Sequence, residues 1–340
     1  MGDRILKNHR AGGDFFLRGM SGCDKIISDG LTKRLLQKQT KGSVCYEAYI
    51  HDSNQKKKYM EGHALLTKPE DKMSLNWIDV REFSFNTLLL LERFQIRMIC
   101  SISDEGFRYA LGIALRGHPD VAWYFENRCP ERAGTVSEII VSAPDAANAD
   151  ELRECEVRVL DYIEDFVIYT KPEMMDTHCD FTRNWDAARL LELADFRGCH
   201  VLDVGAGNGR LTFAAASVAD AVYAVEPVET LRAYIKRRAV RDGISNVRVA
   251  DGLATELPYP DDSFDIVMSG HVVGDDYDAE LRELRRVAKN GGWLIDCPGE
   301  NENKMGPNEG LRVRGWEEFY YASKNGGDVW RYRLRVVKHR

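Results

Sequence analysis

Three glycines at every second position follow an acidic residue in the second half of the chain. Residues 201–204 read Val-Leu-Asp-Val, and Gly205, Gly207 and Gly209 come next, separated by Ala206 and an asparagine. Glycine supplies backbone angles with positive φ and leaves space for a ligand where a Cβ would collide. An apolar strand that ends in such a loop and continues into a helix indicates a site for a nucleotide cofactor.

The spacing of the glycines separates one cofactor from another. A dinucleotide-binding turn has its third glycine three residues after the second, and that position here is Arg210. The aspartate followed by three alternating glycines instead matches the loop that binds S-adenosylmethionine. On these residues, the region 182–340 resembles the class I S-adenosylmethionine-dependent methyltransferases of the small-molecule type. The resemblance implies S-adenosylmethionine as the cofactor and an α/β fold, a doubly wound and mostly parallel seven-stranded sheet with a C-terminal antiparallel hairpin.

Acids at the ends of successive predicted strands support this interpretation. Asp203 lies where it can accept from the cofactor ammonium group. Glu226 ends the apolar run 221–225, and a carboxylate about 20 residues after the loop can take both ribose hydroxyls. Asp251 ends the next run, and in the resembled family that acid accepts from the adenine amino group. The other positions that the resemblance assigns to the cofactor are Ala206, Pro227, Gly252, Leu253, Ser269 and Gly270, together with the three glycines of the loop.

A candidate general base follows the predicted strand 264–269, whose end borders the transferable methyl group in the resembled fold. His271 is the first candidate and Asp275 the second. His271 has an alternative interpretation as a histidine that only packs or forms local hydrogen bonds. The sequence leaves open whether a base is used, because a thiol or amine deprotonated by solvent needs only to be positioned.

The C-terminal segments complete the expected sheet. The pattern predicts a helix over 278–289 that ends at the glycine stop Asn290-Gly291-Gly292, followed by a strand over 293–297. Two extended runs, 316–322 and 329–337, are separated by Asn325-Gly326-Gly327, and this order predicts a hairpin.

The N-terminal part, residues 1–145, is predicted to be a mixed α/β domain with a substrate-binding or lid role. Its first three runs alternate like antiparallel strands, whereas the later ones fit helices or buried strands. The runs are 43–51, 58–67 and 73–80, then 85–101, 106–115 and 121–127. A connecting segment, 146–181, contains an amphipathic helix over 150–169. Its apolar stripe is Leu152, Cys155, Val159, Ile163 and Phe166.

Two groups of aromatic and basic residues are candidates for the acceptor pocket or for a lid over the cofactor. Each group has plain packing as its alternative role. The pocket candidates are Trp123, Tyr124, Phe125 and Arg128, and the lid candidates are Phe181, Arg183 and Trp185.

Composition limits the partners. The chain has 340 residues and a formal net charge of −7, which argues against a broad nucleic-acid surface, since phosphates need clustered Lys and Arg. The first 80 residues are basic, with 14 Lys and Arg against 10 Asp and Glu. No apolar run is long enough for a membrane span and no signal-peptide pattern is present, so we expect a cytoplasmic protein without membrane partners. The oligomeric state is not fixed by these features.

The eight cysteines are scattered, without the spacing of a zinc or redox site, and no metal site is predicted. A methyltransferase for arsenic or another thiophilic element would need a few converging cysteines, which separated positions can still supply in three dimensions. The main prediction is in-line methyl transfer from S-adenosylmethionine to a small-molecule acceptor. The alternatives are an RNA or protein methyltransferase that docks through the basic N-terminal residues, and a non-catalytic module that binds the cofactor.

Overall fold

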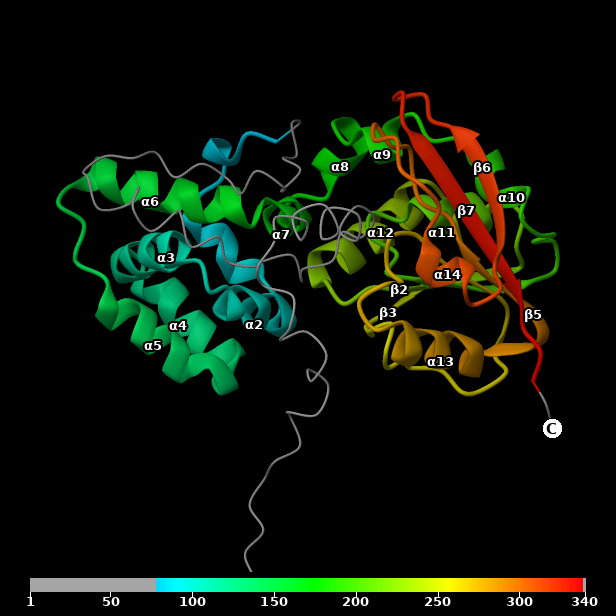
Figure 1. Ribbon diagram of the computed structural model, residues 1–340, viewed down its shortest axis with the longest axis horizontal. Helices are drawn as coiled ribbons and strands as arrows, with labels where there is room; N and C mark the ends of the chain where they lie inside the picture. Colours follow the sequence, from blue (N-terminus) through cyan, green and yellow to red (C-terminus); the bar gives the residue numbers. More distant parts are fainter. Residues whose placement is uncertain (1–77, 339–340) are drawn as a thin grey trace, which may run out of the picture. The chain divides into compact units, whose positions relative to one another are not determined.

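A seven-stranded sheet forms the C-terminal part of the computed structural model (Figure 1). The strand order is β3-β2-β1-β4-β5-β7-β6; β1 to β5 are parallel, and β7 runs antiparallel to both β5 and β6. The strands are β1 (His200–Val204), β2 (Ala221–Val225), β3 (Val247–Ala250), β4 (Phe264–Ser269), β5 (Ala288–Asp296), β6 (Glu317–Ala322) and β7 (Asp328–Arg335). This is the doubly wound, mostly parallel sheet that the sequence predicts.

Apolar side chains of the central strands point alternately to the two faces of the sheet, so each face has its own part of the core. Successive side chains of a strand point to opposite faces. Val201 packs with Leu211 and Ala215 of α11, whereas Leu202 packs with Leu284 of α13. Helices therefore cover both faces, and the crossovers between parallel strands are α11 (Arg210–Ala216), α12 (Glu229–Arg241) and α13 (Tyr277–Val287), with the short α14 (Glu309–Arg312) before the hairpin.

The direction of winding reverses between β1 and β4. β2 and β3 extend the sheet to one side of β1, and β4 and β5 extend it to the other. In open α/β sheets a ligand binds at such a switch point, outside the carboxyl ends of the strands. The carboxyl ends of the parallel strands, with the loops that follow them, are therefore the segments that build the site.

One predicted boundary is wrong. Helix α13 ends at Val287, and Asn290-Gly291-Gly292 lies inside β5, which begins at Ala288. Gly291 has φ 79°, and the pairing of β4 with β5 shifts register here. A Cβ on Gly292 would lie 2.7 Å from the carbonyl oxygen of Asp265. Gly291 therefore allows the irregularity in the strand, and Gly292 allows the close approach of two backbones. In the sequence, the same pair of glycines resembles the end of a helix.

The predicted C-terminal hairpin is confirmed. β6 and β7 pair from Glu317 with Arg333 to Ala322 with Asp328. Gly326, with φ 88°, donates its N–H to the carbonyl of Ser323 in the connecting turn. Positive φ at this point is the reason for glycine in the turn.

The structure describes residues 78–338, all of which belong to one unit of the chain, Val44–Arg340. The predicted strands 43–51 and 58–67, most of 73–80, and nearly all of the basic first 80 residues lie outside these residues. Within the described part, every element before β1 is helical. These elements are η2 (Val80–Glu82), η3 (Phe85–Leu90), α2 (Arg93–Ser101), α3 (Glu105–Gly117), α4 (Pro119–Arg128), η4 (Pro130–Arg132), α5 (Ala133–Ser142), α6 (Ala149–Tyr162), α7 (Glu164–Val167), η5 (Ile168–Thr170), α8 (Glu173–Thr177), α9 (Asp180–Arg183) and α10 (Ala188–Leu191).

The later runs of the N-terminal half are thus helices. The predicted stripe of the helix over 150–169 is buried at Cys155, Val159, Ile163 and Phe166, in a core shared with α3 and α5. The helix itself is interrupted, because Ile163, with φ −111° and ψ 27°, ends α6, and α7 begins at the next residue.

Candidate functional site

The glycine loop connects β1 to α11 and is fixed to the neighbouring strand. The N–H groups of Gly205 and Ala206 both donate to the carbonyl of Val225, at 2.8 and 3.1 Å. All three glycines have positive φ: 67° at Gly205, 57° at Gly207 and 88° at Gly209. A Cβ on Gly205 would lie 2.4 Å from Val272, whereas nothing within 4 Å opposes one on Gly207. The loop is therefore tight on one side and open at its middle.

Asp203 lies buried near the end of β1, with 1% of its surface exposed. Thr212 of α11 donates its hydroxyl to Asp203 Oδ2 at 2.5 Å. Burial raises the pKa of Asp203 to about 6, against the lowering effects of Thr212 and of the positive charge on Arg210. The carboxyl group is thus held in place, and a cationic ligand would favour its ionised form.

Glu226 brings the end of β2 to the glycine loop. Its two carboxylate oxygens accept from the backbone N–H groups of Gly207, at 2.8 Å, and of Val228, at 3.0 Å. Burial raises the pKa of Glu226 to about 7, although both hydrogen bonds act in the opposite direction. An ionised carboxylate has about four acceptor positions. Two protein donors therefore leave Glu226 able to accept from a ligand.

Asp251 follows β3 and is exposed. Its Oδ1 pairs with Arg232 Nη1 at 3.0 Å, and 73% of its side chain is accessible. Arg232 also donates to the carbonyl of Glu226 at 2.7 Å, so one guanidinium joins the ends of β2 and β3. A Cβ on the adjacent Gly252 would lie 2.8 Å from Pro258 and 2.9 Å from Val225, while Leu253 is exposed.

The ends of β4 and β5 add a buried acid that the sequence analysis missed. Ser269 is fully buried and donates its hydroxyl to Asp296 Oδ1 at 3.1 Å. Burial raises the pKa of Asp296 to about 7. Arg210 donates to the carbonyl of Cys297 at 2.9 Å, and its Nη2 would lie 2.7 Å from a Cβ on Gly270. A polar residue at the end of a parallel strand is the signal that could have identified Asp296.

His271 and Asp275 lie in the loop after β4, and both are exposed. His271 has φ 65°, and its Nε2 accepts from the N–H of Gly299 at 3.4 Å. Although the residue as a whole is exposed, the burial of its imidazole, followed by the charge of Arg210, lowers the pKa of His271 to about 4. At neutral pH the imidazole is therefore uncharged and a weak base.

The predicted lid and pocket residues lie in different places. Phe181 packs edge-on against His271, with ring centroids 6.0 Å apart, and Trp185 lies under the guanidinium of Arg210 at 4.5 Å. Phe125, in contrast, is fully buried in the helical core, and Tyr124 donates to the carbonyl of Leu91. Phe181 and Trp185 thus border the site, and Phe125 fits the packing alternative.

Another missed contact reaches the glycine loop from the preceding helices. Asn208, in the loop, is buried and donates Nδ2 to Asp176 Oδ1 of α8 at 2.7 Å. The other oxygen of Asp176 accepts from the hydroxyl of Tyr234 in α12. Nothing in the sequence near the loop indicates Asp176, because the partner lies 32 positions earlier.

A glycine loop at the switch point, with acids at the ends of β1, β2 and β3, defines a nucleotide-cofactor-binding α/β domain. Residues 202–296 match the family described as methyltransferase domain. This segment is a class I S-adenosylmethionine-dependent methyltransferase domain, and its cofactor is S-adenosylmethionine.

Two curated relatives match about a third of the chain. The uncharacterized methyltransferase YcgJ of Bacillus subtilis is 32% identical over 118 residues, which are 34% of this chain and 47% of that protein. The arsenite methyltransferase of Aquipseudomonas alcaligenes is 31% identical over 138 residues, 37% of this chain and 40% of that protein. The chain thus spans less than half the length of these two relatives.

Solved structures show a weaker likeness. An S-adenosylmethionine-dependent methyltransferase from Aquifex aeolicus is 19% identical and has a TM-score of 0.41. The superposition covers 50% of this chain and 98% of that one.

Among the helices of residues 78–338, none combines the length and the apolar character that crossing a bilayer requires.

Proposed function

We propose that this chain transfers a methyl group from S-adenosylmethionine to a small-molecule acceptor by in-line displacement. The observation that carries the proposal is the hydrogen bond between Gly207 and Glu226. It holds the glycine loop beside the carboxylate that would bind the ribose hydroxyls, at the switch point of the sheet. The match of residues 202–296 to the methyltransferase domain family supports the same activity.

The residues present fit this cofactor. Glu226 retains acceptor capacity for the ribose hydroxyls, and the open side of Gly207 leaves space for the amino-acid end. Asp203 would accept from the ammonium group, directly or through water, while Thr212 holds its carboxyl in place. Asp251, exposed beside Gly252, would accept from the adenine amino group.

When bound, the cofactor supplies an electrophilic methyl group on a sulfonium. The chain must hold the acceptor in line with the methyl–sulfur bond and exclude competing water. His271 borders the end of β4, but its pKa of about 4 makes it a poor proton acceptor at neutral pH. The proposal therefore favours positioning over general-base catalysis by His271, with Asp275 as the other candidate in that loop.

Calorimetric titration with S-adenosylmethionine and S-adenosylhomocysteine tests this function. We expect micromolar binding by the intact chain and a loss of at least tenfold for Asp203→Asn and for Glu226→Gln, since each removes a charge-assisted hydrogen bond. Matched controls are Asp195→Asn and Glu131→Gln, acids outside the candidate site whose ion pairs in the described structure are with arginines. No binding by the intact chain would refute the proposal.

Arsenite is a second candidate acceptor, because one relative is named an arsenite methyltransferase. Thiophilic arsenic needs several converging sulfur ligands. Within residues 78–338, no three His, Cys, Asp or Glu side chains are arranged to hold a metal ion, and five of the six cysteines there are buried. These observations favour an organic acceptor. Methylated arsenic detected by mass spectrometry after incubation with arsenite, S-adenosylmethionine and a thiol reductant would reverse this preference.

A further inference from the structure

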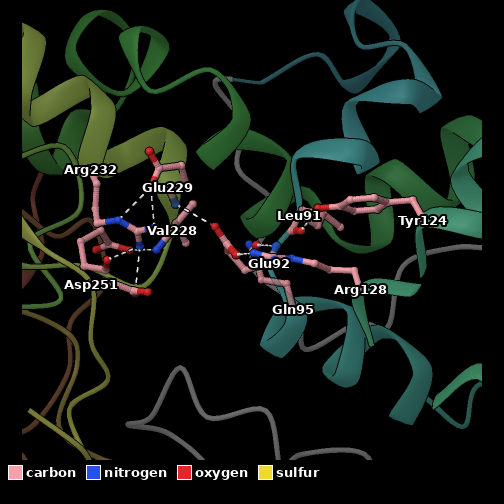
Figure 2. A network of polar contacts seen from close by, with 10 residues as sticks. Leu91, Glu92, Gln95, Tyr124, Arg128, Val228, Glu229, Arg232 and Asp251 are labelled. Carbon is pink, nitrogen blue, oxygen red and sulfur yellow. Dashed lines mark hydrogen bonds and ion pairs between the residues drawn. The ribbon is translucent and has the colours of Figure 1, made fainter. Parts of the chain in front are cut away.

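Helix α12 begins three residues after Glu226 and has no cap of its own. Its N-cap residue is Val228, whose apolar side chain accepts no hydrogen bond. The first N–H groups of a helix have no partner within the helix and need one elsewhere. Figure 2 shows that Glu92 supplies this partner, because its Oε1 accepts from the N–H of Glu229 at 3.0 Å. The acceptor thus comes from a residue 137 positions earlier.

Glu92 is held in this position from its other side. It begins α2 in a capping box with Gln95, whose side chain accepts from the N–H of Glu92 at 2.8 Å. Its Oε2 pairs with Arg128 of α4, and only 9% of the residue is exposed. A buried carboxylate is costly unless it is paired. The ion pair with Arg128 therefore offsets the cost of burying this carboxylate, which faces the positive end of the α12 dipole.

From the first turn of α12, short contacts lead back to the acids of the cofactor site. The carboxylate of Glu229 binds Arg232 Nε at 3.0 Å and Nη2 at 2.5 Å. Arg232 in turn donates to the carbonyl of Glu226. It also donates to Asp251, as Figure 2 shows. The N–H of Val228 donates directly to the Glu226 carboxylate. A shift of this turn would therefore move Glu226.

We propose that Glu92 is a positioning residue for the cofactor site. It caps α12, fixes the turn that carries Val228 and Arg232, and thereby holds Glu226 in the geometry that the ribose hydroxyls require. This inference rests on the proposed function, because it takes Glu226 as the acid that binds the ribose. It gives α2 and α4 a part in cofactor affinity without any contact between their residues and the ligand.

The primary test is the Kd of S-adenosylhomocysteine for the full chain and for Glu92→Gln, measured by calorimetry. Glutamine keeps the size of the side chain but removes the charge that pairs with Arg128 and with the helix end. We expect binding about fivefold to tenfold weaker, because glutamine has one acceptor oxygen for two donors, the Glu229 N–H and Arg128, and no charge at the helix end. Glu131→Gln is the control, because Glu131 pairs with Arg93 and Arg97 of the same helix α2 and leaves α12 untouched. An unchanged Kd for Glu92→Gln would overturn the proposal.

A double-mutant cycle tests the route through Glu226. If Glu92 acts through Glu226, Glu92→Gln should weaken binding little further in the Glu226→Gln background. Equal losses in both backgrounds would mean that Glu92 acts elsewhere, and would overturn the proposed route.

Hydrogen exchange separates this inference from the proposed function. We expect the Glu229 amide to exchange at least fivefold faster in Glu92→Gln, because the cap loses its charge, while the amide of Leu202 in β1 keeps its rate. An unchanged Glu229 rate would overturn the capping role. If the intact chain bound no S-adenosylhomocysteine, the proposed function would fail, and the Glu229 exchange rate would still report whether Glu92 caps α12.

Discussion

The carboxylate of Glu226 accepts the backbone N–H of Gly207 at 2.8 Å, which ties the end of β2 to the glycine loop across 19 positions of the sequence. The geometry of the loop and the ionisation of this acid are therefore coupled. Burial raises the pKa of Glu226 to about 7, so its charge changes within the physiological range.

The affinity for a ligand that contains a ribose should increase as the Glu226 carboxyl group ionises. The ionised carboxylate is the form with acceptor positions for both ribose hydroxyls. We expect the affinity for 5′-methylthioadenosine, which has the ribose but lacks the amino-acid end, to rise about tenfold between pH 6 and pH 8. Calorimetry across that range measures it, with Glu226→Gln as the variant whose weaker binding should not respond. A flat profile for the intact chain would contradict the assignment of Glu226.

The stability of the ligand-free chain should have the opposite pH dependence. The folded state holds the proton of Glu226 up to about pH 7, whereas the unfolded state releases it near 4.5, so the folded state binds more protons between these values. The free energy of unfolding should therefore fall as pH rises from about 4.5 to 7, by about 3 kcal/mol from this group. Urea denaturation at several pH values measures the slope, and Glu226→Gln should reduce it.

Alanine at two glycines should separate crowding from backbone strain. Gly205 and Gly207 both have positive φ, but only Gly205 faces Val272, at 2.4 Å from an added Cβ. We expect Gly207→Ala to cost about 1 kcal/mol of stability through strain and Gly205→Ala about 2 to 4 kcal/mol through strain and overpacking. Chemical denaturation provides both values. Val272→Ala should recover part of the Gly205→Ala loss, and equal costs at the two glycines would contradict this explanation.

The hydroxyl of Thr212 should matter more than its methyl group. Thr212→Val keeps the shape but removes the hydroxyl that donates to Asp203 Oδ2, at the cost of about 1 to 3 kcal/mol for a buried acceptor that loses this partner. The pKa of Asp203 should rise further above 6. Thr212→Ser, which keeps the hydroxyl, should remain close to the original chain in both properties. NMR titration of the carboxyl carbon and urea denaturation measure them.

The sequence predicted those parts of the fold and site that depend on local pattern. Asp203, Glu226 and Asp251 each follow an apolar run, so strand ends alone were enough to place them at one edge of the sheet. The start of β5 at Ala288 could not be predicted in this way, because a glycine such as Gly291 is equally typical of a helix end and of an irregular strand. Local pattern therefore identifies an element more reliably than its end.

Residues that contact the site from distant parts of the sequence could not be identified from a local sequence pattern. Glu92 and Asp176 reach α12 and the glycine loop only through the packing of helices, and their spacing from these partners follows no motif. The sequence analysis noted Arg210 only because a dinucleotide-binding site would have glycine at that position. Its hydrogen bond to the carbonyl of Cys297 depends on the pairing of β4 with β5. Tertiary structure was needed to find all three.

The acids at the carboxyl edge have a consequence for proton balance. Burial raises the pKa values of Asp203, Glu226 and Asp296 to between about 6 and 7. A cationic ligand at this edge favours their ionised forms, so its binding releases protons to the solvent. The heat of binding should then vary with the ionisation enthalpy of the buffer. In the proposed reaction, methyl transfer removes one positive charge from the cofactor, so part of these protons should return to the protein in each cycle.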